Sequence, residues 1–520
     1  MSYLRYLKQI IIAFFLLAIF NCSTTDSNLS NESKRVLHYT VSMNEPSSQQ
    51  YHIELNCDGL NKDTIVLQIP QWMPGYYQIM NYSNGIKNIS ASNADGSNIT
   101  VTPLNSNSWQ IVIGKGNPFS LRYDVIADKR FVAQNWLDST HGYIVPAATF
   151  LYIENSINTP VTVKVNPNKW RNVATGLEPV TPNSNEFYAP DFDILYDCPI
   201  LIGNLDELLP FEINHTIHRF VGYDMGNFDK IKLMDGLKRI VQASVDIIGE
   251  VPYKQYTFIG VGPGQGGIEH LNNTILSFQG DRLGSDAEWV RIMKFIAHEY
   301  FHNYNVKRIR PFELGPFNYN KENRTNLLWV SEGFTVYYEY IVAKRAGVIS
   351  KDDYVASFES NINATENNPG RKFQSLIQSS YNTWSDGPFG VQGQSISYYE
   401  KGPLVGLILD LTIRNATDNK KSLDDVMRYL YWHYYKELNR GFTDAEFQQA
   451  CEMVAGISLN SEFEYVNTTK EIDYNHYLAL AGLQLTTTVN PQNGYKKATI
   501  TKLANTNAKQ NSIYHAWLNE

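Results

Sequence analysis

The hydrophobic pattern changes its period once along the chain, and this change restricts the possible folds more than any other feature. Between about residues 36 and 205, apolar and polar residues alternate in short segments such as 51–55 and 161–165, which is typical of strands with one buried face. After about Asn227, apolar residues recur at steps of three and four, as in 231–248, which is typical of helices. The sequence therefore predicts a multidomain chain, with an N-terminal all-β sandwich or saddle domain followed by a mainly helical α+β domain.

Composition excludes two broad classes of protein. The 520 residues include 44 Lys+Arg and 52 Asp+Glu, which give a formal net charge of −8, whereas a protein that neutralises phosphates needs a basic face. Hydrophobic residues make up 43% and charged residues 18%, which fits packed domains rather than a largely disordered chain. We therefore expect a globular protein that has no nucleic acid partner.

The N-terminus has the pattern of an export signal. Arg5 and Lys8 precede an apolar run of 11 residues, 10–20, a length typical of a signal peptide and too short to span a bilayer. Cys22 follows at the place where a bacterial lipoprotein box carries its lipidated cysteine, although Asn21 departs from the small residue usual before it. We predict a lipoprotein signal peptide over 1–22, a flexible tether over 23–35 and a membrane-anchored protein, periplasmic or at the cell surface; ordinary secretion is the alternative.

Three further cysteines are far apart in the sequence. Cys57, Cys198 and Cys451 lack the close spacing of a zinc ribbon or of a disulfide framework. We expect three buried thiols, although one disulfide is possible in an oxidising compartment.

The strongest chemical signal is the pair of histidines His298 and His302, with Glu299 between them. Histidines at i and i+4 lie on one helix face and can share a tetrahedral zinc, and the glutamate is then placed to accept a proton from a zinc-activated water. Ser285 with Glu288 predicts a capping box at the start of this helix. The alternative is that both histidines are ordinary core or surface residues.

A catalytic zinc usually has three protein ligands, so a third ligand must come from elsewhere. Glu332 is the best candidate, because a carboxylate in the apolar helical stretch 327–346 needs a partner or a metal. Glu313, Glu322 and Glu339 compete on spacing alone. Glu339, two turns further along the same helix, is either a group that orients a ligand histidine or a solvated charge.

Together, His298-Glu299-x-x-His302, Asn305-Val306-Lys307-Arg308-Ile309-Arg310-Pro311 and Trp329-x-x-Glu332-Gly333-Phe334-Thr335 resemble the glycyl aminopeptidase family of gluzincin zinc metallopeptidases, relatives of thermolysin and aminopeptidase N. The segment Gln71-Trp72-Met73-Pro74-Gly75-Tyr76-Tyr77 resembles the N-terminal domain signature of that family. The resemblance implies an N-terminal β domain over 36–205, a thermolysin-like zinc peptidase domain over 206–482, and one zinc ion held by His298, His302 and Glu332.

Gly266-Gly267-Ile268-Glu269-His270 resembles the Gly-x-Met-Glu-Asn element of aminopeptidase N-like enzymes. The resemblance implies that Gly266 and Gly267 let a peptide lie along a strand edge, and that Glu269 binds the free α-amine of the substrate. His270 stands where that element has Asn, so amine recognition is expected to differ in detail. The alternative is a Gly-Gly turn with two exposed polar residues.

Tyr398-Tyr399-Glu400-Lys401-Gly402 precedes an apolar helix expected over 403–413, and it resembles the Tyr-Glu-Lys-Gly element of the same enzymes. The matching tyrosine is Tyr399, which by this resemblance would donate a hydrogen bond to the oxyanion opposite zinc. The alternative is a packing role in a chain with 34 tyrosines.

These features predict a zinc-dependent aminopeptidase that hydrolyses N-terminal residues from peptides, with Glu299 as general base. The resemblance adds a preference for small residues, Gly or Ala. Two alternatives stay open: a zinc endopeptidase on the same scaffold, which would accept a blocked N-terminus, and a non-catalytic surface lipoprotein that binds peptides or glycans.

Two departures from the family pattern carry expectations of their own. Tyr304 stands where the family has Trp, and we expect it to change only the packing behind the metal. The segment 483–520 is shorter than the roughly 60 residues that a small independent domain needs, so we expect no complete PDZ domain there.

Overall fold

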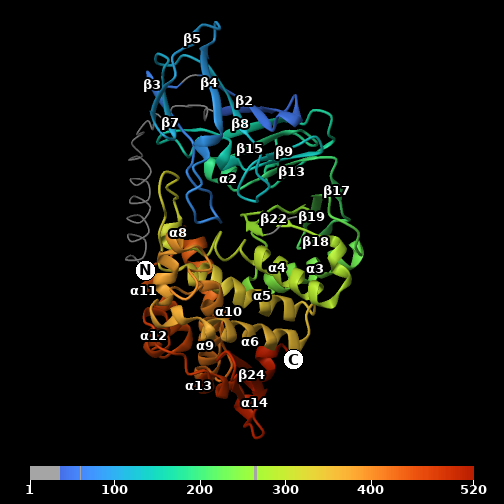
Figure 1. Ribbon diagram of the computed structural model, residues 1–520, viewed down its shortest axis with the longest axis vertical. Helices are drawn as coiled ribbons and strands as arrows, with labels where there is room; N and C mark the ends of the chain where they lie inside the picture. The colour runs from blue at the N-terminus through green and yellow to red at the C-terminus, as the bar shows by residue number, and fades with distance from the viewer. Residues whose placement is uncertain (1–35, 59, 263–265) are drawn as a thin grey trace, which may run out of the picture. The chain divides into compact units, whose positions relative to one another are not determined.

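The N-terminal part of the chain consists of three β-sheets, which confirms the β domain expected from the two-residue period (Figure 1). The structure is a computed structural model, and it describes residues 36–58, 60–262 and 266–520. The largest sheet has the order β14 (Glu178–Pro179), β15 (Glu186–Ala189), β12 (Val161–Asn166), β1 (Leu37–Ser42), β2 (Gln50–Cys57), β8 (Phe119–Ile126), β4 (Ile86–Asn93) and β5 (Asn98–Ile99).

Two four-stranded sheets complete this part. One has the order β13 (Asn172–Thr175), β16 (Ile200–Gly203), β10 (His141–Ile144) and β9 (Trp136–Leu137). The other has the order β11 (Tyr152–Ile153), β3 (Thr64–Gln68), β7 (Ser108–Val112) and β6 (Thr102–Asn105). The short helix α2 (Phe192–Tyr196) comes before β16.

Strand β2 shows how the sequence pattern builds these sheets. It pairs antiparallel with both β1 and β8, and its alternate residues Tyr51, Ile53 and Leu55 are buried. Successive side chains of a strand point to opposite faces, so the other residues face outward. The predicted alternation thus places one face of the sheet in the core.

The second part of the chain begins with a sheet of its own, in the order β17 (Asp206–Glu207), β19 (Thr216–Tyr223), β20 (Gln255–Val261), β22 (Asn273–Ser277) and β21 (Gly267–Glu269), with β18 (Phe211–Ile213) paired to β19. The helix α3 (Lys230–Ile248) connects the parallel strands β19 and β20. It begins at the cap Asp229 and ends at Gly249, whose φ of 95° is readily adopted only by glycine. The predicted boundary at 205/206 falls between β16 and β17.

The remainder of the chain is mainly helical, as expected. Its longer helices are α4 (Asp286–Phe301), α5 (Phe334–Arg345) after a π-helical turn η6 (Trp329–Gly333), α6 (Lys351–Asn367), α9 (Tyr398–Ala416) and α11 (Asp444–Ala455). Shorter ones are α7 (Leu376–Tyr381), α8 (Thr383–Asp386), α10 (Leu423–Tyr429), the π-helical η8 (Leu430–Glu437), α12 (Asn460–Asn467) and α13 (Tyr474–Leu478). Among the described residues, no helix combines the length and the apolar character needed to cross a bilayer.

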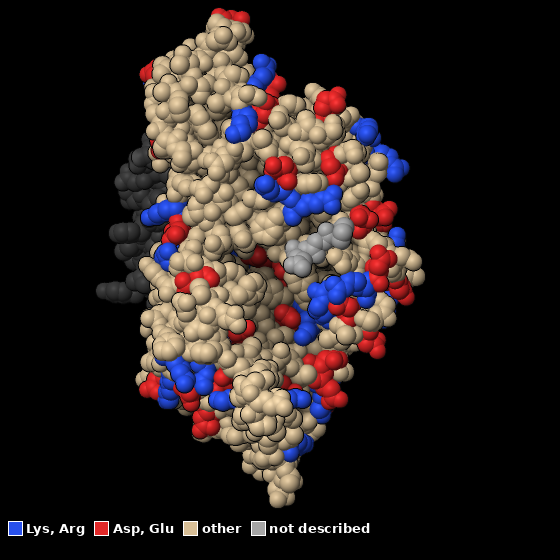
Figure 2. Space-filling model, viewed as in Figure 1, with Lys and Arg blue, Asp and Glu red and all other residues tan. Residues whose placement is uncertain are grey.

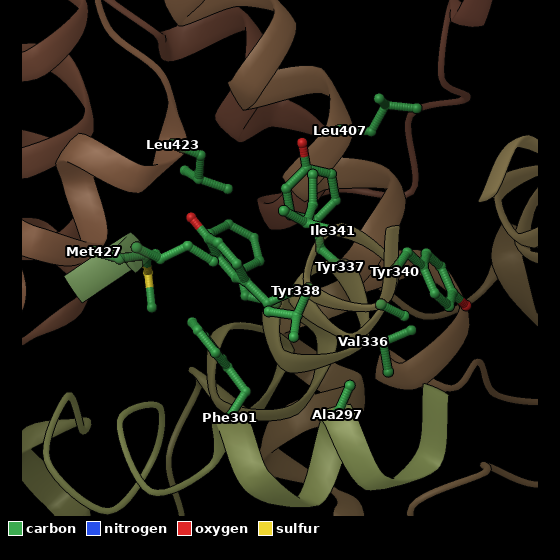
Figure 3. Close-up of a cluster of buried hydrophobic side chains, with 14 of the residues drawn as sticks. Ala297, Phe301, Val336, Tyr337, Tyr338, Tyr340, Ile341, Leu407, Leu423 and Met427 are labelled. Carbon is green, nitrogen blue, oxygen red and sulfur yellow. The ribbon is translucent and has the colours of Figure 1, made fainter. Parts of the chain in front are cut away.

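Helices α4 and α5 are held together by a close-packed core (Figure 3). The rings of Phe301 on α4 and Tyr338 on α5 stack with centroids 4.5 Å apart and an interplanar angle of 12°. Ala297, one turn before Phe301, is fully buried in the same core. Side chains in such a core interdigitate at close-packed density, and removing one leaves a cavity. This packing therefore fixes the position of α4 against α5.

The β part and the helical part share their cores. Trp72 and Tyr77 of the N-terminal segment are buried in the helical core. Val221 on β19 and Ile259 on β20, in the six-stranded sheet, are buried in the β core. The indole of Trp72 also donates a hydrogen bond to the carbonyl of Asn318 at 2.9 Å. Residues 37–520 accordingly form one compact unit.

Two predicted helix starts need correction. Helix α9 begins at Tyr398 rather than at Pro403, so the proline lies inside the helix. Pro403 has no N–H to donate to the carbonyl of Tyr399. Asn361 Nδ2 donates to that carbonyl instead, at 3.3 Å. At α4, Ser285 caps the backbone N–H of Glu288 as predicted. The Glu288 carboxylate binds Arg282 and Arg291 instead of closing the box.

Other sequence predictions concern the cysteines and the ends of the chain. Cys57, Cys198 and Cys451 are all buried, as expected. The predicted signal peptide with Cys22, and the predicted tether, lie outside the described residues. The segment 483–520 forms a hairpin of β23 (Leu483–Val489) and β24 (Lys496–Lys502) followed by α14 (Ala508–Leu518). It packs on the helical part, for example through Ile500 N, which donates to Glu359 Oε1 at 2.7 Å.

Candidate active site

The last turn of α4 brings two imidazoles together. Nε2 of His298 lies 3.0 Å from Nε2 of His302, and the two rings are nearly perpendicular, at 89°. Both side chains are buried. The i, i+4 spacing of the sequence thus directs the Nε2 atoms of both rings toward a single point.

The π-helical turn before α5 brings a carboxylate to the same point. Glu332 Oε2 lies 3.3 Å from His302 Nε2 and 3.7 Å from His298 Nε2. Within the described part of the chain, His298, His302 and Glu332 form the group of side chains able to hold a metal ion. Ligands about 2.0–2.1 Å from a tetrahedral zinc are separated from one another by about 3.3–3.4 Å. The three separations, 3.0, 3.3 and 3.7 Å, bracket this value, which suits a zinc ion.

Nδ1 of each imidazole lies near an oxygen acceptor, which leaves Nε2 as the atom that could bind a metal. His302 Nδ1 donates to the carbonyl of Asn305 at 2.7 Å, and that carbonyl also accepts from Thr335 Oγ1 at 2.8 Å. His298 Nδ1 lies 3.4 Å from Glu339 Oε2. The structure thus places Glu339 behind a candidate ligand, rather than among the ligands.

The other competing carboxylates lie away from this group. Glu313 Oε2 accepts a hydrogen bond from Thr325 at 3.0 Å, and Glu322 pairs with Arg324 at 2.6 Å. Sequence spacing alone could not separate these glutamates from Glu332, because the choice depends on where the π-helical turn packs.

The charges of the site favour a cation. Burial acts to raise the pKa of Glu332, yet the two histidines hold it well below its usual range. Burial acts to lower the pKa of His298, but Glu332 and Glu339 more than offset this and raise it to about 10. Buried carboxylates around two imidazoles thus stabilise a positive charge between them, which a divalent ion would supply.

Glu299 lies beside the candidate ligands with room to accept a proton. Burial raises its pKa to about 7, although the neighbouring imidazoles act in the opposite direction. Its Oε2 is buried and makes no hydrogen bond to the described residues. A β-carbon added to Gly267 would lie 2.8 Å from Glu299 Oε1, so the glycine allows strand β21 to approach this carboxylate.

Strand β21 forms one edge of the six-stranded sheet that also contains β19, β20 and β22. It pairs antiparallel with β22, with Gly267 opposite Leu276, and it is the last strand in the sheet order. Gly266, just before it, has a φ of 87°. A strand edge of this kind offers backbone groups to an extended peptide.

At the end of β21, Glu269 is buried, with 4% of its surface exposed. Lys307 Nζ lies 3.8 Å from its Oε1 and 2.9 Å from Asp197 Oδ1. A β-carbon added to Gly75 of the N-terminal part would lie 2.9 Å from Glu269 Oε2. Sequence reasoning identified Glu269 but missed its neighbours Gly75 and Lys307, which come from distant parts of the chain. Both belong to motifs that the family resemblance had already singled out, and those motifs were the signal that could have identified them.

His270 contacts Asp197 rather than a candidate metal ligand. It is fully buried, and its Nδ1 lies 3.1 Å from Asp197 Oδ1. His270 and Lys307 thus share Asp197 as a partner, and Lys307 also lies near Glu269. A cavity of about 100 Å³ is lined by Gly75, Tyr77 and Glu269, among others.

Tyr399 approaches the candidate ligands from the first turn of α9. Its hydroxyl donates to Glu332 Oε2 at 2.9 Å, whereas the hydroxyl of the adjacent Tyr398 bonds Thr383 Oγ1 at 3.0 Å. The two adjacent hydroxyls thus have different partners. In Figure 2, acidic atoms lie inside a hollow in the middle of the visible face.

Comparisons with known proteins show that the chain is similar to aminopeptidases. The chain matches the family model of the peptidase M61 N-terminal domain over residues 38–204, and that of the M61 glycyl aminopeptidase over residues 291–405. It is similar to the crystal structure of an aminopeptidase N family protein from Idiomarina loihiensis, with a TM-score of 0.82, 25% identity and coverage of 89% of this chain and 81% of that one. No curated protein sequence matches the chain.

Two more distant structures share the fold. An M1 zinc metallopeptidase from Deinococcus radiodurans matches with a TM-score of 0.53 and 13% identity, covering 84% of this chain and 94% of that one. Legionella pneumophila aminopeptidase A, in complex with aspartic acid, matches with a TM-score of 0.52 and 13% identity, covering 90% of this chain and 52% of that one. At such low identity they inform on the fold alone.

The position of Glu339 predicts an effect on metal affinity. We expect Glu339→Gln to weaken zinc binding by about 10–100-fold, the usual cost of losing a carboxylate behind a ligand histidine. Titration against a competing chelator measures the dissociation constant. Glu322→Gln, which removes a carboxylate remote from the site, is the control and should leave it unchanged. Equal affinity of Glu339→Gln and the unaltered protein would mean that Glu339 does not help His298 to bind the metal.

Proposed function

Because the chain belongs to the M61 glycyl aminopeptidase family, we propose that it is a zinc aminopeptidase that removes small N-terminal residues, such as Gly or Ala, from peptides. The observation that carries this proposal is the position of Glu269. A buried carboxylate ends the edge strand whose Gly267 borders Glu299, so a peptide along that strand would meet the carboxylate with its N-terminus. A bound zinc ion would be held by His298, His302 and Glu332.

The ligand set suits zinc because it combines two imidazoles with one carboxylate, as in other catalytic zinc sites. When bound, zinc activates a water molecule and polarises the peptide carbonyl. One ion is proposed, because the three ligand atoms converge on one point.

The protein groups then divide the proton transfers between them. Glu299 accepts a proton from the attacking water at its free Oε2 and returns it to the leaving nitrogen. The hydroxyl of Tyr399 turns from Glu332 Oε2, to which it donates without substrate, and donates its hydrogen bond to the oxygen of the scissile carbonyl as negative charge develops there. Glu269 holds the α-ammonium of the substrate, so that the first peptide bond reaches Glu299.

The N-terminal β part also contributes to the proposed substrate site. Gly75 covers the Glu269 carboxylate so closely that a side chain at this position would contact it, and Tyr77 lines the cavity beside it. An acylated amine would leave Glu269 without a donor in this enclosed site, at a cost in binding free energy. This supports a requirement for a free N-terminus.

An endopeptidase is the second candidate, and one observation favours it. Lys307 already lies 3.8 Å from Glu269, so the carboxylate has a positive neighbour even without a substrate amine. A chain that passed Glu269 without offering an ammonium would then be tolerated better than in a site without this lysine.

A digest of matched peptides separates the two candidates. We expect the purified protein to release single N-terminal residues from free peptides, and to leave their N-acetylated forms intact, as followed by mass spectrometry. Glu299→Gln should slow the reaction by about 10²–10⁴-fold through loss of the general base, while zinc content stays the same. Internal cuts in both peptide sets would identify an endopeptidase instead.

Replacement of Tyr399 tests the proposed oxyanion donor. We expect Tyr399→Phe to lower kcat by about 10²–10³-fold with little change in KM, since the lost hydrogen bond is strongest in the transition state. Tyr398→Phe is the matched control, because the neighbouring hydroxyl binds Thr383 instead. A similar fall of kcat in both variants would mean that Tyr399 acts through packing.

We further propose, from the sequence, that the protein is exported and anchored to a membrane by lipid on Cys22. The support is the charged and apolar segment that precedes this cysteine. Mass spectrometry of the mature N-terminus should find a lipidated Cys22, and Cys22→Ser should move the protein from the membrane fraction to the soluble fraction. An unmodified N-terminus beyond Cys22 would contradict the proposal.

A further inference from the structure

An exposed aromatic side chain lies next to the proposed oxyanion donor. Phe389 is 76% exposed, although its ring centroid lies 5.7 Å from that of Tyr399. The Tyr399 hydroxyl in turn contacts Glu332, a proposed zinc ligand. When a ligand covers a large apolar surface beside the reacting atoms, the removal of that surface from water favours binding.

The loop that carries Phe389 is fixed in place by its backbone. Ser397 Oγ donates to the carbonyl of Pro388 at 2.9 Å, and Val391 N donates to Ser395 Oγ at 2.6 Å. Gly390, with a φ of 70°, packs so tightly that an added β-carbon would lie 2.8 Å from the carbonyl of Ile396. The structure therefore presents Phe389 at a defined place.

The scissile carbonyl that the Tyr399 hydroxyl would bind belongs to the N-terminal residue itself, and the ring of Phe389 contacts the ring of Tyr399. Phe389 is therefore adjacent to the place that the N-terminal residue would occupy. A substrate whose amine is on Glu269 and whose carbonyl is at Tyr399 would have its first side chain between them.

We propose that Phe389 forms an apolar wall of the subsite for the side chain of the N-terminal residue. The inference rests on the proposed aminopeptidase function and concerns its selectivity. A glycine would leave the ring exposed, whereas the methyl group of alanine or the larger side chain of leucine would cover part of it. The loop thus adds a preference for apolar N-terminal residues over glycine, among those that the site admits.

Isomeric tripeptides test this role. The substrates are Ala-Gly-Gly and Leu-Gly-Gly, with Gly-Gly-Gly as reference and Gly-Ala-Gly and Gly-Leu-Gly as isomers, and the measurement is kcat/KM for release of the first residue. Relative to Gly-Gly-Gly, we expect Phe389→Ala to lower kcat/KM by about threefold for Ala-Gly-Gly and about tenfold for Leu-Gly-Gly. The values for Gly-Gly-Gly and the two isomers should stay the same.

Two control variants accompany the test. Phe389→Leu keeps an apolar side chain and should retain most of the preference. Phe373→Ala removes a phenylalanine of similar exposure, 70%, just after the turn Pro369–Lys372, and should change no ratio. Because both phenylalanines are largely exposed, all three variants should fold, and a thermal unfolding midpoint checks this.

The outcomes separate this inference from the function on which it rests. Equal losses on all tripeptides, unchanged ratios, or an effect that follows the second residue would each overturn the role of Phe389 while leaving an aminopeptidase. If the unaltered, zinc-loaded protein releases no N-terminal residue from any tripeptide, the proposed function fails and this inference fails with it.

Discussion

The proposed chemistry depends on a contact between two glycines. Gly333, in the π-helical turn, and Gly402, in α9, are so close that a β-carbon added to either would lie 2.7 Å from the Cα of the other. Glu332 comes directly before Gly333, and Tyr399 lies one turn before Gly402. The close approach of the two backbones therefore brings a candidate metal ligand and a candidate oxyanion donor within one hydrogen bond of each other. Side chains at these glycines would separate them.

How much of the site the sequence could predict depended on the distance along the chain. His298 and His302 belong to one helix turn, so their spacing alone predicts that they share a ligand position. Glu332 follows in a separate π-helical turn; its apolar stretch and the family resemblance favoured it, but spacing alone did not separate it from Glu313, Glu322 and Glu339. The start of α9 was misjudged because Pro403 suggested a helix N-terminus, whereas Asn361, from another helix, supplies the missing donor. Strands such as β2 were predicted well because alternation is a local property.

The shared cores explain why the substrate site could not be assigned to one domain from the sequence. Trp72 is buried among the helices, and its ring packs edge-on against Trp384 at 5.2 Å, while Ile268, next to Glu269, is buried in the β core. Gly75 and Glu269 therefore come together through tertiary packing from two distant segments. Since the turn around Gly75 is fixed on one side by the β core and on the other by the helical core, the proposed amine anchor is pre-organised rather than formed on binding.

This arrangement assigns affinity and selectivity to different kinds of structure. Glu269 is buried, and its surroundings include Lys307, Asp197 and the backbone of Gly75, so changes there carry the cost of an unpaired buried charge. Phe389 is exposed on a loop outside both cores, where a substitution leaves folding almost unaffected. A peptidase built in this way would keep its requirement for a free amine while its preference among N-terminal side chains changes through the loop. The constraint that fixes the chemistry thus leaves the choice of side chain adjustable.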